Sequence, residues 1–280
     1  MRRLLELLRP SGRATPPAGA PAAEPDGPLP APDRLTYVIG DIHGCAPQLR
    51  SLLARIAEDA ADTPHDMIFL GDYIDRGPDS ADVLRLLMTL DDAQGSDGRL
   101  TFLAGNHDHM LLHYLGAPED GVRWLWVGGR DTLTSFGIPE LRIGGDAEDP
   151  MAARVIAQAE ALAQAMGEPM IQWLADRPLW WRSGNVVAVH ALTDPKIPME
   201  DQSDETLLWA RPDDTLTPRV DGTWVVHGHT IVAAPSVRAR HINVDTGAFQ
   251  SGVLTAAVLA PGKAPRFLTS EGSGSSERED

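Results

Sequence analysis

The chain has 280 residues, of which 42% are hydrophobic and 23% charged, and this composition excludes the fully disordered and fibrous classes. Asp and Glu number 40 against 24 Lys and Arg, and the net charge of −16 argues against a general nucleic-acid binder. A single cysteine, Cys45, excludes an intrachain disulfide, so we expect a reducing compartment, the cytoplasm. No apolar run reaches the ~20 residues of a membrane span, so no integral membrane association is expected.

Both ends of the chain have the composition of tails. Residues 1–33 form a Pro/Ala-rich tract that can bury too little apolar surface to fold, and we predict a disordered N-terminal tail. Residues 269–280 are rich in Ser, Gly and Glu and are predicted to be a second disordered tail. One folded domain is therefore predicted over residues 34–268. The pattern leaves open whether residues 137–167 cap its active site, and it leaves the oligomeric state unknown.

Strand-like and helical patterns alternate in the first half of this domain. Strands are predicted at residues 35–39, 67–70 and 100–104, and helices at 49–61, 80–90 and 109–115. This alternation indicates an α/β fold with parallel neighbouring strands. In the second half, predicted helices at 151–166 and 170–174 precede predicted strands at 186–189, 224–226, 242–244 and 253–259. The shorter connections there favour more antiparallel pairing.

Polar clusters follow the predicted strands. The first three strands run into Gly-Asp-Ile-His-Gly at 40–44, Gly-Asp-Tyr-Ile-Asp-Arg-Gly at 71–77 and Gly-Asn-His-Asp at 105–108. Two later strands end at His190 and at His227-Gly228-His229. Ligands bind at the carboxyl ends of strands in open α/β sheets, so these side chains are expected at one edge. Asp, His and Asn together suit manganese, iron or zinc, and paired metals promote displacement at phosphorus.

These five motifs, in this order over residues 40–230, resemble those of the calcineurin-like metallophosphoesterases. Within that group the chain resembles the bacterial and phage branch of the phosphoprotein phosphatase family of Ser/Thr phosphatases. The resemblance covers about residues 35–259. It implies an α/β fold with a central mixed β-sandwich flanked by helices, and a dimetal site at the C-terminal ends of strands. The implied cofactor is two divalent cations, with manganese expected first and iron or zinc as alternatives.

The resemblance also implies a role for each matching residue. The metal ligands would be Asp41, His43, Asp72, Asn106, His190 and His229, with Asp72 bridging both ions and a hydroxide between the ions attacking phosphorus in line.

The remaining matches concern the substrate. Arg76, Arg211 and Asn106 would bind the substrate phosphate. His107 would protonate the leaving alkoxide, and Asp75 would orient it.

The first expectation for function is a Ser/Thr protein phosphatase acting on phosphorylated protein or a small phosphoester. One alternative is a nucleotide hydrolase like the bis(5'-nucleosyl)-tetraphosphatases. Another is a non-catalytic scaffold of the same fold, against which the intact motifs argue. The role of His227 stays open between packing and support of the site, Asp245 is interpreted as part of the sheet, and Trp124 as core. Asp108 replaces the Glu of eukaryotic members, and Ala191 and Leu192 replace two glycines, which leaves the substrate open.

Overall fold

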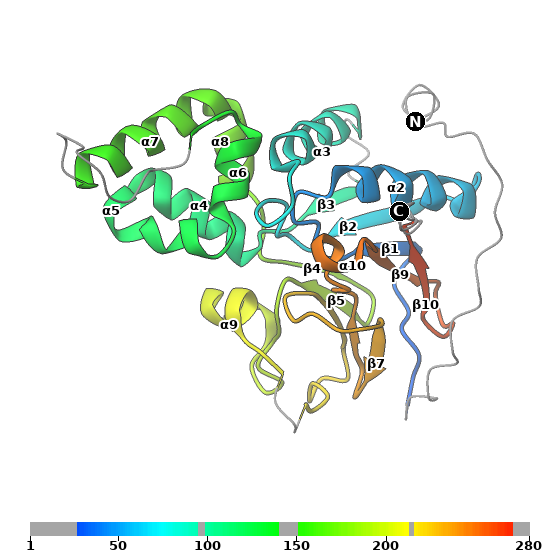
Figure 1. Ribbon diagram of the computed structural model, residues 1–280. Helices are drawn as coiled ribbons and strands as arrows, with labels where there is room; N and C mark the ends of the chain where they lie inside the picture. The colour runs from blue at the N-terminus through cyan, green and yellow to red at the C-terminus, as the bar shows by residue number, and fades with distance from the viewer. Residues whose placement is uncertain (1–26, 95–98, 140–150, 213–215, 271–280) are drawn as a thin grey trace, which may run out of the picture.

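The computed structural model describes residues 27–94, 99–139, 151–212 and 216–270, in which two five-stranded sheets lie face to face (Figure 1). The first sheet has the order β10-β9-β1-β2-β3, with β1 (Leu35–Ile39), β2 (His65–Phe69), β3 (Leu100–Phe102), β9 (Thr255–Leu259) and β10 (Arg266–Thr269). The second has the order β4-β5-β6-β8-β7, with β4 (Trp180–Ser183), β5 (Val186–Val189), β6 (Trp224–His227), β7 (Ser236–Arg238) and β8 (His241–Asn243).

The alternation of side chains along the strands builds two cores. Successive residues of a strand point to opposite faces. In β1, Val38 therefore packs between the sheets with residues such as Trp224 of β6, whereas Tyr37 and Ile39 face the helices. Each of these four side chains is fully buried. The central mixed β-sandwich expected from the sequence is thus present.

Helices cover both outer faces of the sandwich. Over and beside the first sheet lie α2 (Ala46–Ala60), α3 (Ser80–Gln94), α4 (Asn106–Gly116), α5 (Pro118–Gly121), η3 (Val122–Trp126), α6 (Gly129–Ser135), α7 (Met151–Met166) and α8 (Glu168–Ala175) (Figure 1). The second sheet packs against η4 (Met199–Asp201) and α9 (Asp204–Trp209), while α10 (Ala248–Ser251) precedes β9. No helix within the described parts of the chain has the length and apolarity needed to cross a bilayer.

Strand order confirms the first half of the sequence prediction and corrects the second. β1 pairs with β2, and β2 with β3, in parallel, as the alternating pattern predicted. The prediction of mostly antiparallel pairing was wrong for β5, β6 and β8, which are parallel neighbours. The connection from β5 to β6 contains η4 and α9, and the one from β6 to β8 contains β7. Both connections are therefore long enough to return the chain to the same end of the sheet.

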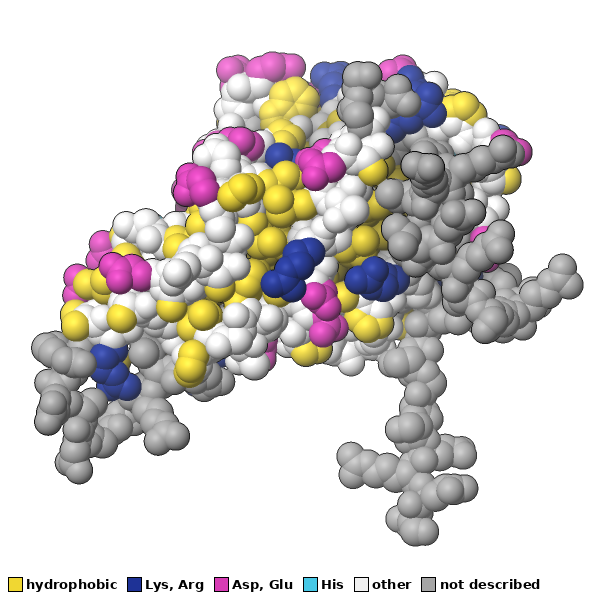
Figure 2. All heavy atoms as spheres, turned by 90° about the horizontal axis from the view of Figure 1, so that it is seen from above, with side chains coloured by type: hydrophobic (Ala, Val, Ile, Leu, Met, Phe, Trp, Pro, Cys, Tyr) yellow, Lys and Arg dark blue, Asp and Glu magenta, His cyan; other side chains and the backbone are white. Residues whose placement is uncertain are grey.

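The surface mixes apolar and charged side chains. Figure 2 shows hydrophobic side chains across the middle of the upper face, with Asp, Glu, Lys and Arg interspersed among them. On this face the acidic excess of the composition is therefore spread over the described surface and forms no single block.

Residues 28–33 lie against the second sheet. The side chain of Asn185 accepts a hydrogen bond from the Ala31 backbone N–H at 2.6 Å and donates one to the Leu29 carbonyl at 3.0 Å. Trp224 Nε1 donates to the Pro28 carbonyl at 2.9 Å. Contacts with the domain therefore begin six residues before the predicted boundary at residue 34. Beyond the domain, the tail predictions for residues 1–26 and 271–280 lie outside the described residues.

Asn185 is the residue whose loss should loosen this segment. Asn185→Ala leaves the Ala31 N–H and the Leu29 carbonyl without their side-chain partner. We expect the free energy of unfolding to fall by about 1–3 kcal/mol, measured by urea denaturation, with unchanged hydrolytic activity. Gln172→Ala, which removes an exposed hydrogen bond to Asp176, is the matched control and should change stability by less than about 0.5 kcal/mol. Equal stability of the two variants would contradict this role for Asn185.

Candidate metal and phosphate site

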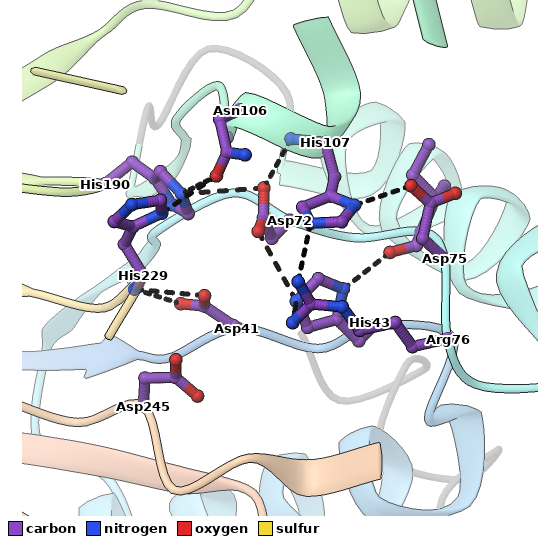
Figure 3. A network of polar contacts seen from close by, with 12 residues as sticks. Asp41, His43, Asp72, Asp75, Arg76, Asn106, His107, His190, His229 and Asp245 are labelled. Carbon is purple, nitrogen blue, oxygen red and sulfur yellow. Dashed lines mark hydrogen bonds and ion pairs between the residues drawn. The ribbon is translucent and has the colours of Figure 1, made fainter. Parts of the chain in front are cut away.

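The five motifs converge where the two sheets meet. Asp41 and His43 follow β1, Asp72 follows β2, and Asn106 begins α4 directly after β3. His190 follows β5, and His229 lies two residues beyond the end of β6. Their side chains point toward one another in Figure 3. Two parallel sets of strand ends, one from each sheet, thus bring together all the residues that the sequence predicted as metal ligands.

Unusual backbone geometry marks the same place. Eight described non-glycine residues have positive φ, and five of them belong to the motifs, namely His43, Asp72, Asp75, Arg76 and His229, with φ between 43° and 74°. Such conformations cost free energy and are retained where the surrounding structure enforces them, which is common at functional sites. The turns after the strands are therefore built to aim side chains and not to shorten loops.

Gly228 shows how tightly these turns pack. A Cβ atom at this position would lie 1.9 Å from Asp41 Oδ1. The next backbone N–H, that of His229, donates to Asp41 Oδ2 at 3.0 Å. The second sheet thus holds a carboxylate of the first sheet in place through its backbone, and a side chain at residue 228 would displace that carboxylate.

Asp72 lies at the centre of the cluster. Its Oδ2 is 3.4 Å from His43 Nε2, and its Oδ1 is 3.6 Å from His190 Nε2. Its Oδ1 also accepts a hydrogen bond from the His107 backbone N–H at 2.9 Å. One carboxylate therefore presents an oxygen to a histidine on each side.

The histidine protons show that nitrogen lone pairs face this cluster. His43 and His190 approach the carbonyls of Ile74 and Leu70 through Nδ1, at 2.8 and 2.9 Å, so that nitrogen carries the proton. Burial lowers the pKa of His190 and lowers that of His43 to about 3, so each ring is neutral at pH 7 and has no second proton. Both Nε2 lone pairs then point at Asp72. A neutral imidazole with Nδ1–H bound to a carbonyl is the usual form of a metal ligand.

Asn106 adds a further acceptor. Its Oδ1 is 2.8 Å from His190 Nε2 and 2.9 Å from His229 Nδ1. Because His190 Nε2 carries no proton, two acceptors face each other there, an arrangement that a cation between them would stabilise. Burial also lowers the pKa of His229 to about 4, and its buried Nε2 has no hydrogen-bond partner among the described residues.

Carboxylates accumulate beside these rings. Asp41, Asp72 and Asp245 are each 2% exposed, and Asp245 lies next to Asp41 (Figure 3). Burial raises the pKa of Asp41, and the negative charges of Asp245 and Asp72 raise it further. Burial likewise raises the pKa of Asp245 to about 6. Sequence analysis treated Asp245 as part of the sheet and missed this proximity, which only the packing of β8 beside β1 reveals.

The donor set therefore fits two divalent cations. Two groups of potential ligand atoms lie within 4.8 Å of one another, one from His43, Asp72 and His107 and one from Asp41, Asp72 and His190. Asp72 belongs to both, as a bridging carboxylate must. Oxygen and imidazole nitrogen ligands of this kind suit manganese, iron or zinc.

His107 belongs to a separate, hydrogen-bonded dyad. Its Nδ1 donates to Asp75 Oδ2 at 2.6 Å. Asp75 is fully buried and also accepts hydrogen bonds from Trp124 Nε1 at 2.8 Å and from the Thr132 hydroxyl at 2.6 Å. His107 Nε2 is left facing Arg76 Nη2 at 2.9 Å. Trp124 is thus a core residue, as predicted, but its indole N–H also positions Asp75, which its sequence context did not indicate.

Asp108 is another positioning residue that the sequence did not reveal. Its buried carboxylate accepts hydrogen bonds from the backbone N–H groups of Asp72, Tyr73 and Gly105 at 2.9, 3.2 and 3.0 Å. It therefore ties the turn after β2 to the first turn of α4. Sequence analysis noted Asp108 only as a departure from the Glu of eukaryotic members, because its partners are backbone groups that leave no signal in the sequence.

A cavity of about 370 Å³ opens over this cluster. Asp72, Asn106, His107 and His229 line it together with three arginines, Arg76, Arg123 and Arg211. Arg211, predicted as a second phosphate ligand, is close enough for its positive charge to contribute to the low pKa of His229. Arg123 was not singled out in the sequence, because nothing in its surroundings resembles a motif.

Two further questions from the sequence concern neighbours of the site. His227 is buried behind it, with its ring centroid 5.8 Å from that of His241, and it does not line the cavity. None of the residues of α7 lines the cavity either, because this helix packs against α4, α5 and α8. Residues 140–150, the rest of the candidate cap, lie outside the described part of the chain.

Asp72→Asn should separate metal binding from folding. An amide offers one weak oxygen ligand in place of two charged ones, so the variant should bind fewer than two equivalents of Mn²⁺ and lose more than about 100-fold in turnover. Metal content after dialysis, measured by atomic emission, is the readout. Asp82→Asn, an exposed carboxylate paired with Arg85, is the control and should keep full occupancy. Full manganese occupancy in Asp72→Asn would contradict the bridging assignment.

Known proteins similar to this chain share this arrangement of motifs. A bis(5'-nucleosyl)-tetraphosphatase described as asymmetrical, from Halalkalibacterium halodurans, is 27% identical over 242 residues, covering 78% of this chain and 87% of its own. A symmetrical bis(5'-nucleosyl)-tetraphosphatase from Serratia proteamaculans is 45% identical over 93 residues, but this match spans only 30% of that protein and 31% of this chain.

Solved structures agree in fold. The crystal structure of a putative diadenosine tetraphosphatase superposes with a TM-score of 0.55 at 24% identity, covering 84% of this chain and 93% of its own. A protein serine/threonine phosphatase from Saccharomyces cerevisiae gives 0.54 at 15% identity, with 86% and 80% covered. The family description calcineurin-like phosphoesterase matches residues 35–233, which include every residue of the cluster around Asp72 except Asp245. The chain is therefore a member of the calcineurin-like phosphoesterase family.

Proposed function

We propose that the protein is a dimetal phosphoester hydrolase whose substrates are dinucleoside polyphosphates such as diadenosine tetraphosphate. The observation that carries this proposal is the convergence of Arg76, Arg123 and Arg211 on one cavity above the carboxylate cluster. A single phosphate monoester carries two negative charges and needs one or two such side chains, whereas a chain of phosphates can engage all three. The relative that covers most of this chain is named for the same kind of substrate.

Each residue of the site has a part in this proposal. Asp41, His43, Asp72, Asn106, His190 and His229 would hold the two cations. When bound, the cations would stabilise negative charge on the phosphoryl oxygens and lower the pKa of a water molecule. Arg76 and Arg211 would hold the reactive phosphate in line for displacement. His107 would donate a proton from Nε2 to the leaving oxygen, while Asp75 fixes the ring and stabilises its charged form.

A second candidate, the Ser/Thr protein phosphatase first expected, is favoured by the His107–Asp75 dyad. A leaving serine or threonine alkoxide is strongly basic and needs a proton as the bond breaks, whereas a leaving nucleotide phosphate is a weak base. A buried carboxylate at 2.6 Å from His107 Nδ1 is well suited to the more demanding leaving group. The dyad thus supports phosphomonoester hydrolysis, and the arginines support polyphosphate hydrolysis.

Substrate ranking after metal depletion would decide between the candidates. The protein is stripped with a chelator, then assayed with and without Mn²⁺ on diadenosine tetraphosphate, a phosphothreonine peptide and a small aryl phosphate. We expect activity only with Mn²⁺, and kcat/KM at least 10-fold higher for the dinucleotide. A higher value for the peptide would select the protein phosphatase. No turnover of any substrate by protein that binds two metals would leave the non-catalytic scaffold.

His107→Asn tests the proton donor. The variant cannot donate a proton from the Nε2 position, so kcat should fall by about 10²–10⁴-fold on the phosphothreonine peptide and by less on substrates with acidic leaving groups. Steady-state kinetics on leaving groups of graded pKa is the measurement, with bound manganese checked in the same samples. A uniform loss for all leaving groups would show that His107 does not act as the acid.

A further inference from the structure

Trp209 is a large aromatic side chain held in the open at the edge of the site. It ends α9, whose neighbouring residues Leu207 and Leu208 are buried under the helix. The side chain of Trp209 is 43% exposed and lines the cavity next to Arg211. Burying an indole elsewhere would release more apolar surface from water, so its position in a polar cavity indicates a role for its flat face.

Arg123 lines the same cavity from a different part of the fold. It lies in η3, which packs against α4, α5 and α6, and its neighbours Trp124 and Leu125 are buried. The exposed guanidinium has no hydrogen bond or ion pair with any described residue, although Asp120 also lines this part of the cavity. An arginine without a partner at the rim of an anion site is free to bind phosphate oxygens.

The helix α9 and the η3 segment belong to different halves of the molecule. α9 packs on the outer face of the second sheet, and η3 lies among the helices beside the first. Between them the floor of the cavity is formed by His107, Asn106 and the carboxylate of Asp72. A ligand whose reactive phosphate lies on this floor can therefore contact an arginine and an aromatic ring that lie outside the reacting centre.

We infer that Arg123 and Trp209 form a recognition site for the rest of a nucleoside polyphosphate: Arg123 binds the phosphates beyond the reactive one, and Trp209 stacks on the nucleobase. The inference rests on the proposed function and extends it to the residues that select the substrate. Stacking on an aromatic side chain accepts any base, so the site distinguishes nucleotides from other phosphoesters and does not distinguish one base from another.

A comparison of ligands that share phosphates but differ in the base tests both residues. The binding ligands are inorganic tetraphosphate and a diadenosine tetraphosphate with methylene bridges in place of the bridging oxygens, which cannot be hydrolysed there. Their dissociation constants are measured by calorimetry on the Mn²⁺-loaded full-length protein. Turnover of a phosphothreonine peptide without aromatic residues is measured in parallel.

The two variants should give different patterns. Trp209→Ala should weaken the dinucleotide analogue about 5- to 100-fold, leave tetraphosphate binding unchanged, and be rescued largely by Trp209→Phe. Arg123→Ala should weaken both polyphosphates about 10-fold, with partial rescue by Arg123→Lys. Neither variant should change peptide turnover. Trp126→Ala is the matched control, because Trp126 is 63% exposed, lies outside the cavity, and stacks with Arg130 at 4.2 Å.

Failure of the inference is distinguishable from failure of the proposed function. If the wild-type protein hydrolyses diadenosine tetraphosphate but Trp209→Ala binds the analogue as tightly as wild type, the stacking role is wrong and the function stands. If the wild-type protein binds the analogue through both residues without hydrolysing the natural dinucleotide, the recognition site stands and the proposed reaction is wrong. Equal binding of both polyphosphates by wild type and both variants would overturn the inference whatever the activity.

Discussion

The burial of three carboxylates in one space is the constraint on which the site depends. Asp41, Asp72 and Asp245 come from different strands and are almost inaccessible to water, and their like charges repel one another. Neutral histidines around them offer lone pairs and no compensating protons. Such an arrangement is stable when cations compensate the charge, so metal binding and the local fold are coupled. Both sheets must be in place before the ligands meet.

A second set of buried carboxylates serves geometry. Asp108 accepts three backbone N–H groups and joins the turn after β2 to the start of α4. Asp75 accepts hydrogen bonds from His107, Trp124 and Thr132. Burial raises the pKa of Asp75, and these hydrogen bonds oppose that rise because they favour its charged form. The dyad and the metal ligands are therefore positioned by independent networks, and a change in one need not disturb the other.

Family membership defines the reaction class, whereas the walls of the cavity select the substrate. The carboxylates, histidines and Asn106 suit any phosphoester, and the dyad suits a basic leaving group. What distinguishes this chain is the set of residues around them, Arg123, Arg211 and Trp209, which come from segments outside the motifs. A long polyanion with an aromatic end matches their chemistry, which is why the dinucleotide is proposed ahead of the phosphopeptide.

Much of this protein was determined by its sequence alone. Residues close to one another in the chain, such as Asp41 with His43 or Asp75 with Arg76, form motifs whose spacing predicted the first three strands, the α/β fold and the cluster around Asp72. The parallel order of β5, β6 and β8 was decided only by tertiary structure, because it depends on how long connections return across the sheet. The same is true of Asp245 beside Asp41, Trp124 on Asp75 and Arg123 in the cavity. These contacts join residues distant in sequence through packing, and a single sequence carries no pattern for them.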